Sequence, residues 1–300
     1  MTNVAVIGSG TMGNGIAHVF AQYDYKISLI DISEASLAKA MNTIQKNLTR
    51  QVEKELITKE IKDRALENIK TSTDVKSGIL DAELIVEAAT ENLDLKLKIF
   101  RDLDEFASPG AILASNTSSI SITKIAGVTR HPENVIGMHF MNPVPVMKLV
   151  EVIRGKQTSD EVTHQVMTLS KKLGKIPVEV NDAPGFVANR ILMPMINEAI
   201  YALHEGVSGV EEIDTVMRLG MSHPMGPLQL ADFIGLDVCL FILNVLHEGF
   251  GTQKYAPCPL LVDMLKPVNT ASKARQDFTC INRVAKNSKS RRDLESRTSS

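Results

Sequence analysis

The stretch Val4-Ala-Val-Ile-Gly-Ser-Gly-Thr-Met-Gly13 decides the fold of the first half of this 300-residue chain. Its glycines, Gly8, Gly10 and Gly13, follow a short β-like apolar run and precede a helical pattern. Gly8 permits a tight turn, Gly10 lets the backbone approach a pyrophosphate, and Gly13 lets the helix pack closely on the strand. Because a helix N-terminus offers free N–H groups and a partial positive charge, the turn predicts a phosphate-binding site.

A second apolar run, Lys26–Ile30, ends at Asp31, which lies 18 residues after Gly13. A carboxylate at this place accepts hydrogen bonds from an adenosine ribose. A 2′-phosphate would meet like charge there, so NAD is favoured over NADP. We therefore expect NAD as the cofactor, with Thr11 and Met12 completing the contacts of the glycine turn.

The composition is that of an ordinary globular protein, with 44% hydrophobic residues and a net charge of −2. The length suggests one large domain or two modest ones. The near-neutral charge gives no case for a nucleic-acid partner. No run approaches the roughly 20 apolar residues that a membrane helix needs. The first strand begins by Val4, which leaves no room for a signal peptide, so we expect a cytoplasmic protein.

The three cysteines, Cys239, Cys258 and Cys280, are scattered and form no C-x-x-C pair. This sparse, odd count fits a reducing cytoplasm and argues against disulfides and a metal site.

Strand-like and helix-like segments alternate up to about residue 180, which is typical of a parallel α/β sheet. The expected strands are Val4–Ile7, Lys26–Ile30, Leu84–Glu87, Ala111–Ser115, Asn134–His139, Lys148–Ile153 and Ile176–Val180. Residues 33–70 instead show a helical period and predict a helical hairpin inserted after the second strand.

From Ala183 onward the pattern becomes helical. Helices are expected over Phe186–Glu205, Val210–Leu219 and Pro227–Val245. Their surplus apolar faces suggest a partner subunit, and a well-filled monomer core is the alternative. The fold class is thus a Rossmann-type dinucleotide-binding domain over 1–183 with the inserted hairpin, followed by an all-α domain over 184–265.

The last segment, residues 266–300, holds nine Lys and Arg against three Asp and Glu. It shows no clear period, and we expect a poorly ordered basic tail. Binding of an anionic partner is an alternative for such a tail.

The segment from Gly137 to Val152 carries the candidate chemistry. His139 ends one strand, prolines force a turn, and Glu151 lies in the next strand, twelve residues after the histidine. Such a carboxylate fixes the tautomer of the imidazole and stabilises the imidazolium. Next to a nicotinamide, His139 would take the hydroxyl proton of an alcohol while hydride leaves its carbon. A structural buried histidine is the alternative.

Two more segments hold candidate polar groups. Ser115–Ser119 follows a strand, so it lies at the carboxyl edge of the sheet, where open α/β folds bind ligands. Its hydroxyls can contact substrate or nicotinamide, or cap the next helix. Asn189, near the start of the first late helix, can bind a carbonyl, although composition alone would make it a surface residue.

Six ordered motifs together resemble the L-3-hydroxyacyl-CoA dehydrogenase family. They are Gly8-Ser-Gly-Thr-Met-Gly13, Ser115-Asn-Thr-Ser-Ser119, His139-Phe-Met-Asn-Pro143, Lys148-Leu-Val-Glu151, Pro184-Gly-Phe-Val-Ala-Asn-Arg190 and His223-Pro-Met-Gly-Pro227. The resemblance runs from about residue 2 to 265. After Leu265 the sequence departs from the glycine-rich, aromatic ending of the family, and we find no counterpart for a family lysine that approaches the cofactor.

The resemblance implies roles for single residues. His139 is the implied acid/base, Glu151 its orienting partner, and Ser118 and Asn189 the implied substrate contacts. The implied cofactor contacts besides the glycine turn and Ser118 are Asn142, Glu91 and Lys96. The inserted hairpin covers the acyl-CoA in this family, so Arg50 and Lys54 are loosely matched to the CoA phosphates.

The resemblance predicts NAD-linked interconversion of a short-chain L-3-hydroxyacyl-CoA and its 3-oxoacyl-CoA, in fatty-acid or butyrate metabolism, by a homodimer. Two alternatives stay open. One is a dehydrogenase of a free hydroxy or sugar acid, and the other is a cofactor-binding protein with impaired catalysis.

Overall fold

The computed structural model describes residues 2–266. In that range the chain forms two compact units, of which the first ends at Phe186 and the second begins at Val187. The predictions about the basic tail and about Cys280 lie outside the described residues.

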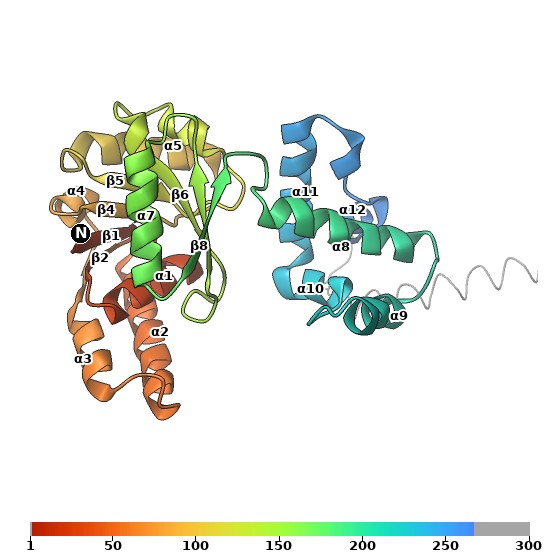
Figure 1. Ribbon diagram of the computed structural model, residues 1–300, viewed down its shortest axis with the longest axis horizontal. Helices are drawn as coiled ribbons and strands as arrows, with labels where there is room; N and C mark the ends of the chain where they lie inside the picture. The colour runs from red at the N-terminus through yellow and green to blue at the C-terminus, as the bar shows by residue number, and fades with distance from the viewer. Residues whose placement is uncertain (1, 267–300) are drawn as a thin grey trace, which may run out of the picture. The chain divides into compact units, whose positions relative to one another are not determined.

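The first unit is built on a sheet that, within residues 2–186, has eight strands in the order β3-β2-β1-β4-β5-β6-β7-β8 (Figure 1). All neighbouring strands are parallel except β6 and β7, which are antiparallel. The strands are β1 (Asn3–Ile7), β2 (Lys26–Ile30), β3 (Ile69–Ser72), β4 (Leu84–Glu87), β5 (Ile112–Ser115), β6 (Val135–Phe140), β7 (Leu149–Arg154) and β8 (Ile176–Asn181). The order reverses between β1 and β4, where the carboxyl ends of such a sheet bind ligands.

Helices cover both faces of this sheet. Because side chains alternate along a strand, Val4 and Val6 of β1 face one apolar core while Ala5 and Ile7 face another. The first core includes side chains of α1 (Thr11–Gln22), α2 (Glu34–Glu53), α3 (Lys59–Glu67) and α7 (Asp160–Lys172). The second includes side chains of α4 (Val75–Ile79), α5 (Leu93–Phe106) and α6 (Ile122–Ala126). A single-turn 3₁₀ helix, η1 (Pro132–Asn134), precedes β6.

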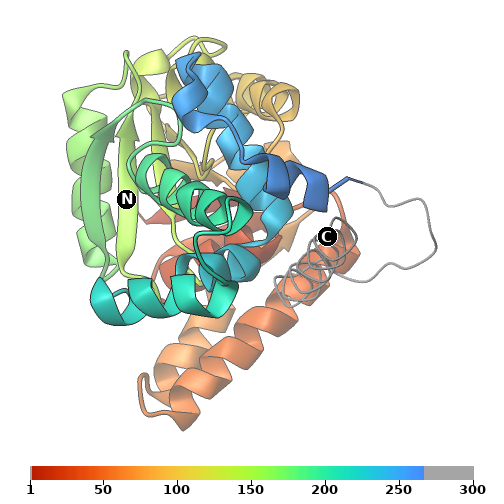
Figure 2. The same cartoon turned by 90° about the vertical axis from the view of Figure 1, so that its right-hand side faces the viewer.

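The predicted hairpin is present as α2 and α3, and it extends away from the sheet in both views (Figure 2). Each of its helices is capped by a hydroxyl, because Ser33 accepts a hydrogen bond from the amide of Ser36 and Thr58 from that of Ile61. Of its apolar side chains, Ile44 and Leu48 are fully buried in the core of the first unit.

The described part of the second unit, residues 187–266, is helical throughout. Its elements are α8 (Ala188–His204), α9 (Val210–Thr215), the π-helical turn η2 (Val216–Gly220), α10 (Pro227–Ile234), α11 (Leu236–Phe250), the 3₁₀ turn η3 (Gln253–Tyr255) and α12 (Pro259–Met264). Cys239 and Cys258 are buried in its core as free thiols. Burial raises the pKa of Cys239 to about 12, which fits a structural thiol.

The structure confirms the fold class and corrects several elements. The expected helix over Pro227–Val245 is wrong, because the chain bends by 98° between α10 and α11. Gly235 lies at this bend with a φ of +104°, a conformation that favours glycine. Val210–Leu219 is not one regular helix, since α9 ends at Thr215. The expected helix over Phe186–Glu205 starts two residues later, at Ala188, and strand β3 was not predicted.

Within residues 2–266, no single helix has the length and apolarity to cross a membrane, although the bent pair α10–α11 meets those two criteria jointly.

Candidate active site

The glycine turn joins β1 to α1 and has the geometry that a dinucleotide needs. A Cβ on Gly13 would overlap the carbonyl oxygen of Gly8, so the helix start and the strand end pack too closely for any side chain. A Cβ on Gly10 would meet no atom within 4 Å, which leaves this position open to a ligand. Gly10 caps α1 without a side-chain hydrogen bond, so the first amides of the helix are available to phosphate oxygens.

A cavity of about 760 Å³ opens beside this turn, and we call it the glycine-turn pocket. It is lined by segments from both sides of the point where the strand order reverses. Among its lining residues are Gly8, Gly10, Thr11, Gly15, Asp31, Ser36, Lys39, Ala88, Ala89, Asn142, Pro143, Val144 and Pro145. A glycine turn, an open helix N-terminus and a pocket of this size are what binding of NAD requires.

Asp31 follows β2 and is half-buried at the edge of the pocket. Its Oδ2 accepts hydrogen bonds from the amide and the hydroxyl of Ser9, at 2.8 and 2.7 Å. Its Oδ1 accepts from the amide of Ser33. These bonds fix the carboxylate beside the glycine turn, where the sequence places the ribose of the cofactor.

His139 and Glu151 are brought together by the pairing of β6 with β7. The two residues are directly opposite each other in this antiparallel ladder. The Nδ1 of His139 lies 2.8 Å from Oε2 of Glu151, and both side chains are buried. The ring of Phe186 packs 5.9 Å from the imidazole, centroid to centroid. Because the carboxylate engages Nδ1, Nε2 is the ring nitrogen through which such an imidazole can exchange a proton.

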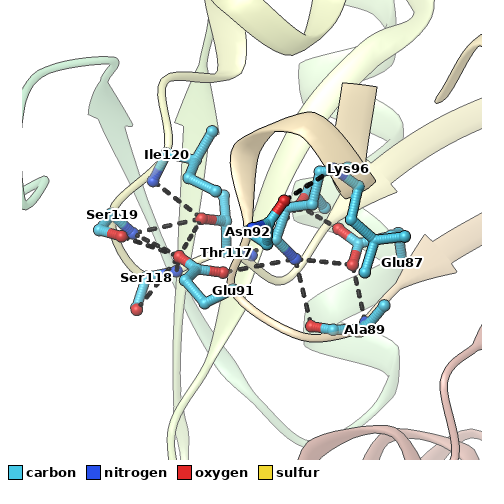
Figure 3. Close-up of polar contacts among 11 residues, drawn as sticks. Glu87, Ala89, Glu91, Asn92, Lys96, Thr117, Ser118, Ser119 and Ile120 are labelled. Carbon is cyan, nitrogen blue, oxygen red and sulfur yellow. Dashed lines mark hydrogen bonds and ion pairs between the residues drawn. The ribbon is translucent and has the colours of Figure 1, made fainter. Parts of the chain in front are cut away.

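A second polar group, which includes Glu87 and Lys96, is drawn in Figure 3. It lies at the carboxyl ends of β4 and β5, where Glu87 and Ser115 are register partners. Glu87 is fully buried, and its Oε2 accepts the hydroxyl hydrogen of Ser115 at 2.6 Å. Its Oε1 lies 2.6 Å from Nζ of Lys96, which is itself buried and also pairs with Oε2 of Glu91 at 3.3 Å. Two carboxylates thus share one ammonium group in the protein interior.

The carboxylate of Glu91 joins this group to the serine loop, residues 116–119 (Figure 3). Its Oε1 accepts hydrogen bonds from the amides of Ser118 and Ser119, at 3.0 and 3.1 Å, and from the hydroxyls of Thr117 and Ser119. Burial alone would raise the pKa of Glu91, but the charge of Lys96 and these hydrogen bonds lower it overall. Glu91 is therefore ionised near neutral pH and holds the loop that carries Ser118.

The predicted site residues fall into five places, of which the His139–Glu151 pair between β6 and β7 is the first. Gly8, Gly10 and Thr11 of the glycine turn line one pocket together with Asp31 and Asn142, whereas Met12 and Gly13 do not line it. Glu91, Lys96 and Ser118 belong to one hydrogen-bonded group. Arg50 and Lys54 are exposed at the far end of α2 and do not line the glycine-turn pocket. Asn189 lies in α8 of the second unit and is 9% exposed, so it is not the surface residue that composition alone suggested.

Sequence reasoning missed several polar residues of this region. Glu87 was seen only as the end of a strand, although a charge that closes the run Leu-Ile-Val-Glu is a signal for a functional edge. Asn116 was quoted only within a motif, yet its Oδ1 accepts the amide of Phe140, the residue after His139. The capping alternative for Ser115–Ser119 is not what the structure shows, because Ser121 caps α6.

The comparisons with known proteins agree with this geometry. A family model described as 3-hydroxyacyl-CoA dehydrogenase, NAD binding domain, matches residues 3–183. The model of the C-terminal domain of the same family matches residues 185–279. The match continues beyond Leu265, so the expected end of the resemblance at that residue is wrong.

Individual relatives cover most of the chain. A probable 3-hydroxybutyryl-CoA dehydrogenase of Bacillus subtilis is 50% identical over 275 residues, which are 92% of this chain and 96% of the relative. The human mitochondrial hydroxyacyl-coenzyme A dehydrogenase is 44% identical over 252 residues, 82% of this chain and 80% of that protein. The crystal structure of an (S)-3-hydroxybutyryl-CoA dehydrogenase from Ralstonia eutropha superposes with a TM-score of 0.86 at 49% identity, covering 88% of this chain and 93% of that one. The chain therefore belongs to the 3-hydroxyacyl-CoA dehydrogenase family and is an NAD-dependent dehydrogenase.

Proposed function

We propose that this protein interconverts a short-chain L-3-hydroxyacyl-CoA, such as 3-hydroxybutyryl-CoA, and the corresponding 3-oxoacyl-CoA. The observation that carries the proposal is the buried His139–Glu151 pair, at 2.8 Å, in a chain whose relatives are named for this substrate. NAD, when bound, supplies the acceptor for the hydride that leaves the carbinol carbon.

In this proposal His139 is the general base in the oxidation. Its Nε2 takes the hydroxyl proton of the substrate, and in the reverse reaction it returns that proton to the carbonyl oxygen. Glu151 holds the ring through Nδ1 and stabilises the positive charge that the imidazole gains. The pair is set in neighbouring strands, so its geometry exists before substrate binds, which lowers the cost of reaching the transition state.

The remaining site residues are proposed from their positions and from the family motifs. Asp31 is proposed to bind the adenosine ribose, and Asn142 to approach the nicotinamide from the pocket wall. Glu91, in the loop between β4 and α5, and Lys96, in the first turn of α5, are proposed to contact the cofactor, and Glu91 also holds Ser118. Ser118 and, separately, Asn189 of the second unit are each proposed to bind the substrate. Arg50 and Lys54 are proposed to bind the CoA phosphates.

Two features of organisation are also proposed. We assign residues 1–183 to cofactor binding and residues 184–265 to substrate binding and dimerisation. The second unit exposes large apolar side chains, including Val207, Leu219 and Phe233 at 70–75% of their surface. Such a surface favours a homodimer. Light scattering would measure the mass of the dimer, and Phe233→Lys should weaken its association. A cytoplasmic location and the absence of nucleic-acid and membrane partners remain proposals as well.

The test of the function is oxidation of NADH by acetoacetyl-CoA, followed as loss of NADH absorbance. We expect turnover with acetoacetyl-CoA and longer 3-oxoacyl-CoA thioesters, with kcat/KM highest at short chain length. Free acetoacetate is the matched control, because it has the same reacting end without the CoA arm that positions it. Equal kcat/KM for the free acid would favour a hydroxy-acid dehydrogenase, and NADH binding without turnover would favour a cofactor-binding protein with impaired catalysis.

A further inference from the structure

The loop between β6 and β7 forms one wall of the glycine-turn pocket, through its residues 142–145. It also packs against the helix that the glycine turn opens. A Cβ on Gly15 of α1 would come within 2.9 Å of the Cβ of Val144, so the loop rests directly on the helix backbone. Movement of this loop would therefore change the shape of the pocket next to the helix N-terminus.

Lys175, just before β8, binds this loop through its ammonium group. Its Nζ lies 2.5 Å from the carbonyl oxygen of Val144 and 2.7 Å from that of Met147, and it donates a hydrogen bond to each. The residue is only 8% exposed. One ammonium group thus joins both ends of the segment 144–147. Within this loop the amides of Val146 and Met147 both donate hydrogen bonds to the carbonyl oxygen of Pro143.

The charge of Lys175 is otherwise unaccounted for in the described part of the chain. No ion pair there joins it to a carboxylate. Burial lowers the pKa of Lys175. The positive charge of Lys175 in turn contributes to lowering the pKa of the buried imidazole of His18. A buried ammonium group is costly unless strong acceptors surround it, and the two loop carbonyls are those acceptors. The loop and the lysine therefore stabilise each other.

We propose that Lys175 is a positioning residue for cofactor binding, which clamps the loop of residues 144–147 and so fixes one wall of the glycine-turn pocket. The proposal depends on the proposed function in one respect, which is that the glycine-turn pocket binds NAD. It is separate from proton transfer, because His139 and Glu151 are held by strand pairing rather than by this loop. Loss of the clamp should weaken binding of the dinucleotide more than it slows the chemical step.

The test is Lys175→Met in the full-length chain, with the dissociation constant of NADH measured by the fluorescence of NADH itself. The chain has no tryptophan that would complicate this signal. We expect the dissociation constant and the KM for NADH to rise about tenfold, whereas kcat and the KM for acetoacetyl-CoA change less than about threefold. Hydrogen exchange of the amides of Val146 and Met147 should become faster.

Lys172→Met is the matched control, because it removes an exposed positive charge from the end of α7 and leaves the clamp in place. Lys175→Gln is the second variant, should the methionine disturb folding. Its shorter amide cannot reach both carbonyls, so it should also weaken NADH binding and speed loop exchange. Unchanged NADH binding in either variant would overturn the proposal, as would weaker binding with unchanged exchange of the loop amides. A wild-type chain that binds NADH but does not reduce acetoacetyl-CoA would overturn the proposed function and leave this proposal standing.

Discussion

Two buried histidines of the first unit have opposite surroundings. His139, in β6, lies 2.8 Å from a carboxylate oxygen of Glu151 and keeps a small exposed surface. His18, in α1, has no exposed surface, and its Nε2 lies 3.1 Å from the amide oxygen of Gln22 and 3.4 Å from that of Gln51. A carboxylate stabilises an imidazolium, whereas neutral amides do so only weakly. The partner of a histidine, rather than its burial, therefore determines whether the protonated ring is stabilised.

Removing each imidazole in turn should separate the two histidines most strongly. We expect His139→Gln to lower kcat for acetoacetyl-CoA reduction by about 10³-fold, because the proton donor is lost while binding is kept. His18→Gln is the control and should keep kcat within about threefold, since it lies in a packing contact between α1 and α2. Steady-state kinetics at saturating NADH measure both. Comparable losses in the two variants would contradict the distinction.

Substitution of the side chains that contact each histidine should also distinguish His139 from His18. Glu151→Gln keeps the size of the side chain but removes the charge that stabilises the imidazolium, so kcat should fall about 10²-fold with little change in the KM for NADH. Gln51→Leu removes a partner of His18 and should leave kcat unchanged. A Glu151→Gln enzyme with wild-type turnover would show that the carboxylate is only structural.

The burial of His18 should also make the stability of the fold depend on pH. Burial lowers the pKa of His18 despite its hydrogen bonds to Gln51 and Gln22. The unfolded chain therefore takes up a proton near pH 6.5 that the folded chain does not, so stability is full above that pH and falls as the solution becomes more acidic. Between pH 7 and 5.5 this one group should lower the free energy of unfolding by at most about 1 kcal/mol. Urea unfolding at both pH values should show a loss of unfolding free energy that is larger in the wild type than in His18→Gln.

The smallest effect comes from making the two sites alike. Gln51→Glu places a carboxylate beside His18, which should raise the pKa of the imidazole. The loss of unfolding free energy on acidification should then be smaller than in the wild type. Turnover should not change, and the same urea experiment is the measurement. A pH dependence steeper than that of the wild type would mean that the ring is not the group that titrates.

Much of the fold could be predicted, because its signals are local. The strands with buried apolar side chains, such as β2 and β4, were located within a residue or two of their ends. The glycine turn was identified from its context, since a strand precedes it and a helix follows it. Gly8 and Gly13 are sterically required there, whereas Gly10 leaves space for a ligand. Strand β3 was missed because only Ile69 of its four residues is buried, so neither alternation nor an apolar run marks it.

The errors arise where tertiary contacts override the local pattern. The apolar period runs through Gly235 without interruption, so sequence alone does not distinguish one long helix from α10 and α11. The pair His139 and Glu151 could be predicted because a turn joins two adjacent strands. The group of Glu87, Lys96 and Glu91 could not, because ion pairing between a strand end and a helix has no signature in spacing. The roles of individual site residues stay predictions until the kinetic experiments are done.

The antiparallel pairing of β6 and β7 also limits which changes of chain length the site tolerates. His139 and Glu151 share a face because each lies in a ladder whose side chains alternate. Deleting one residue inside β7 would turn Glu151 to the opposite side of the sheet and deprive the imidazole of its carboxylate. Lengthening the connecting loop leaves the two strands aligned. Insertions in the loop between the strands should therefore leave the contact between His139 and Glu151 intact. A register shift by an odd number of residues within either strand should remove it.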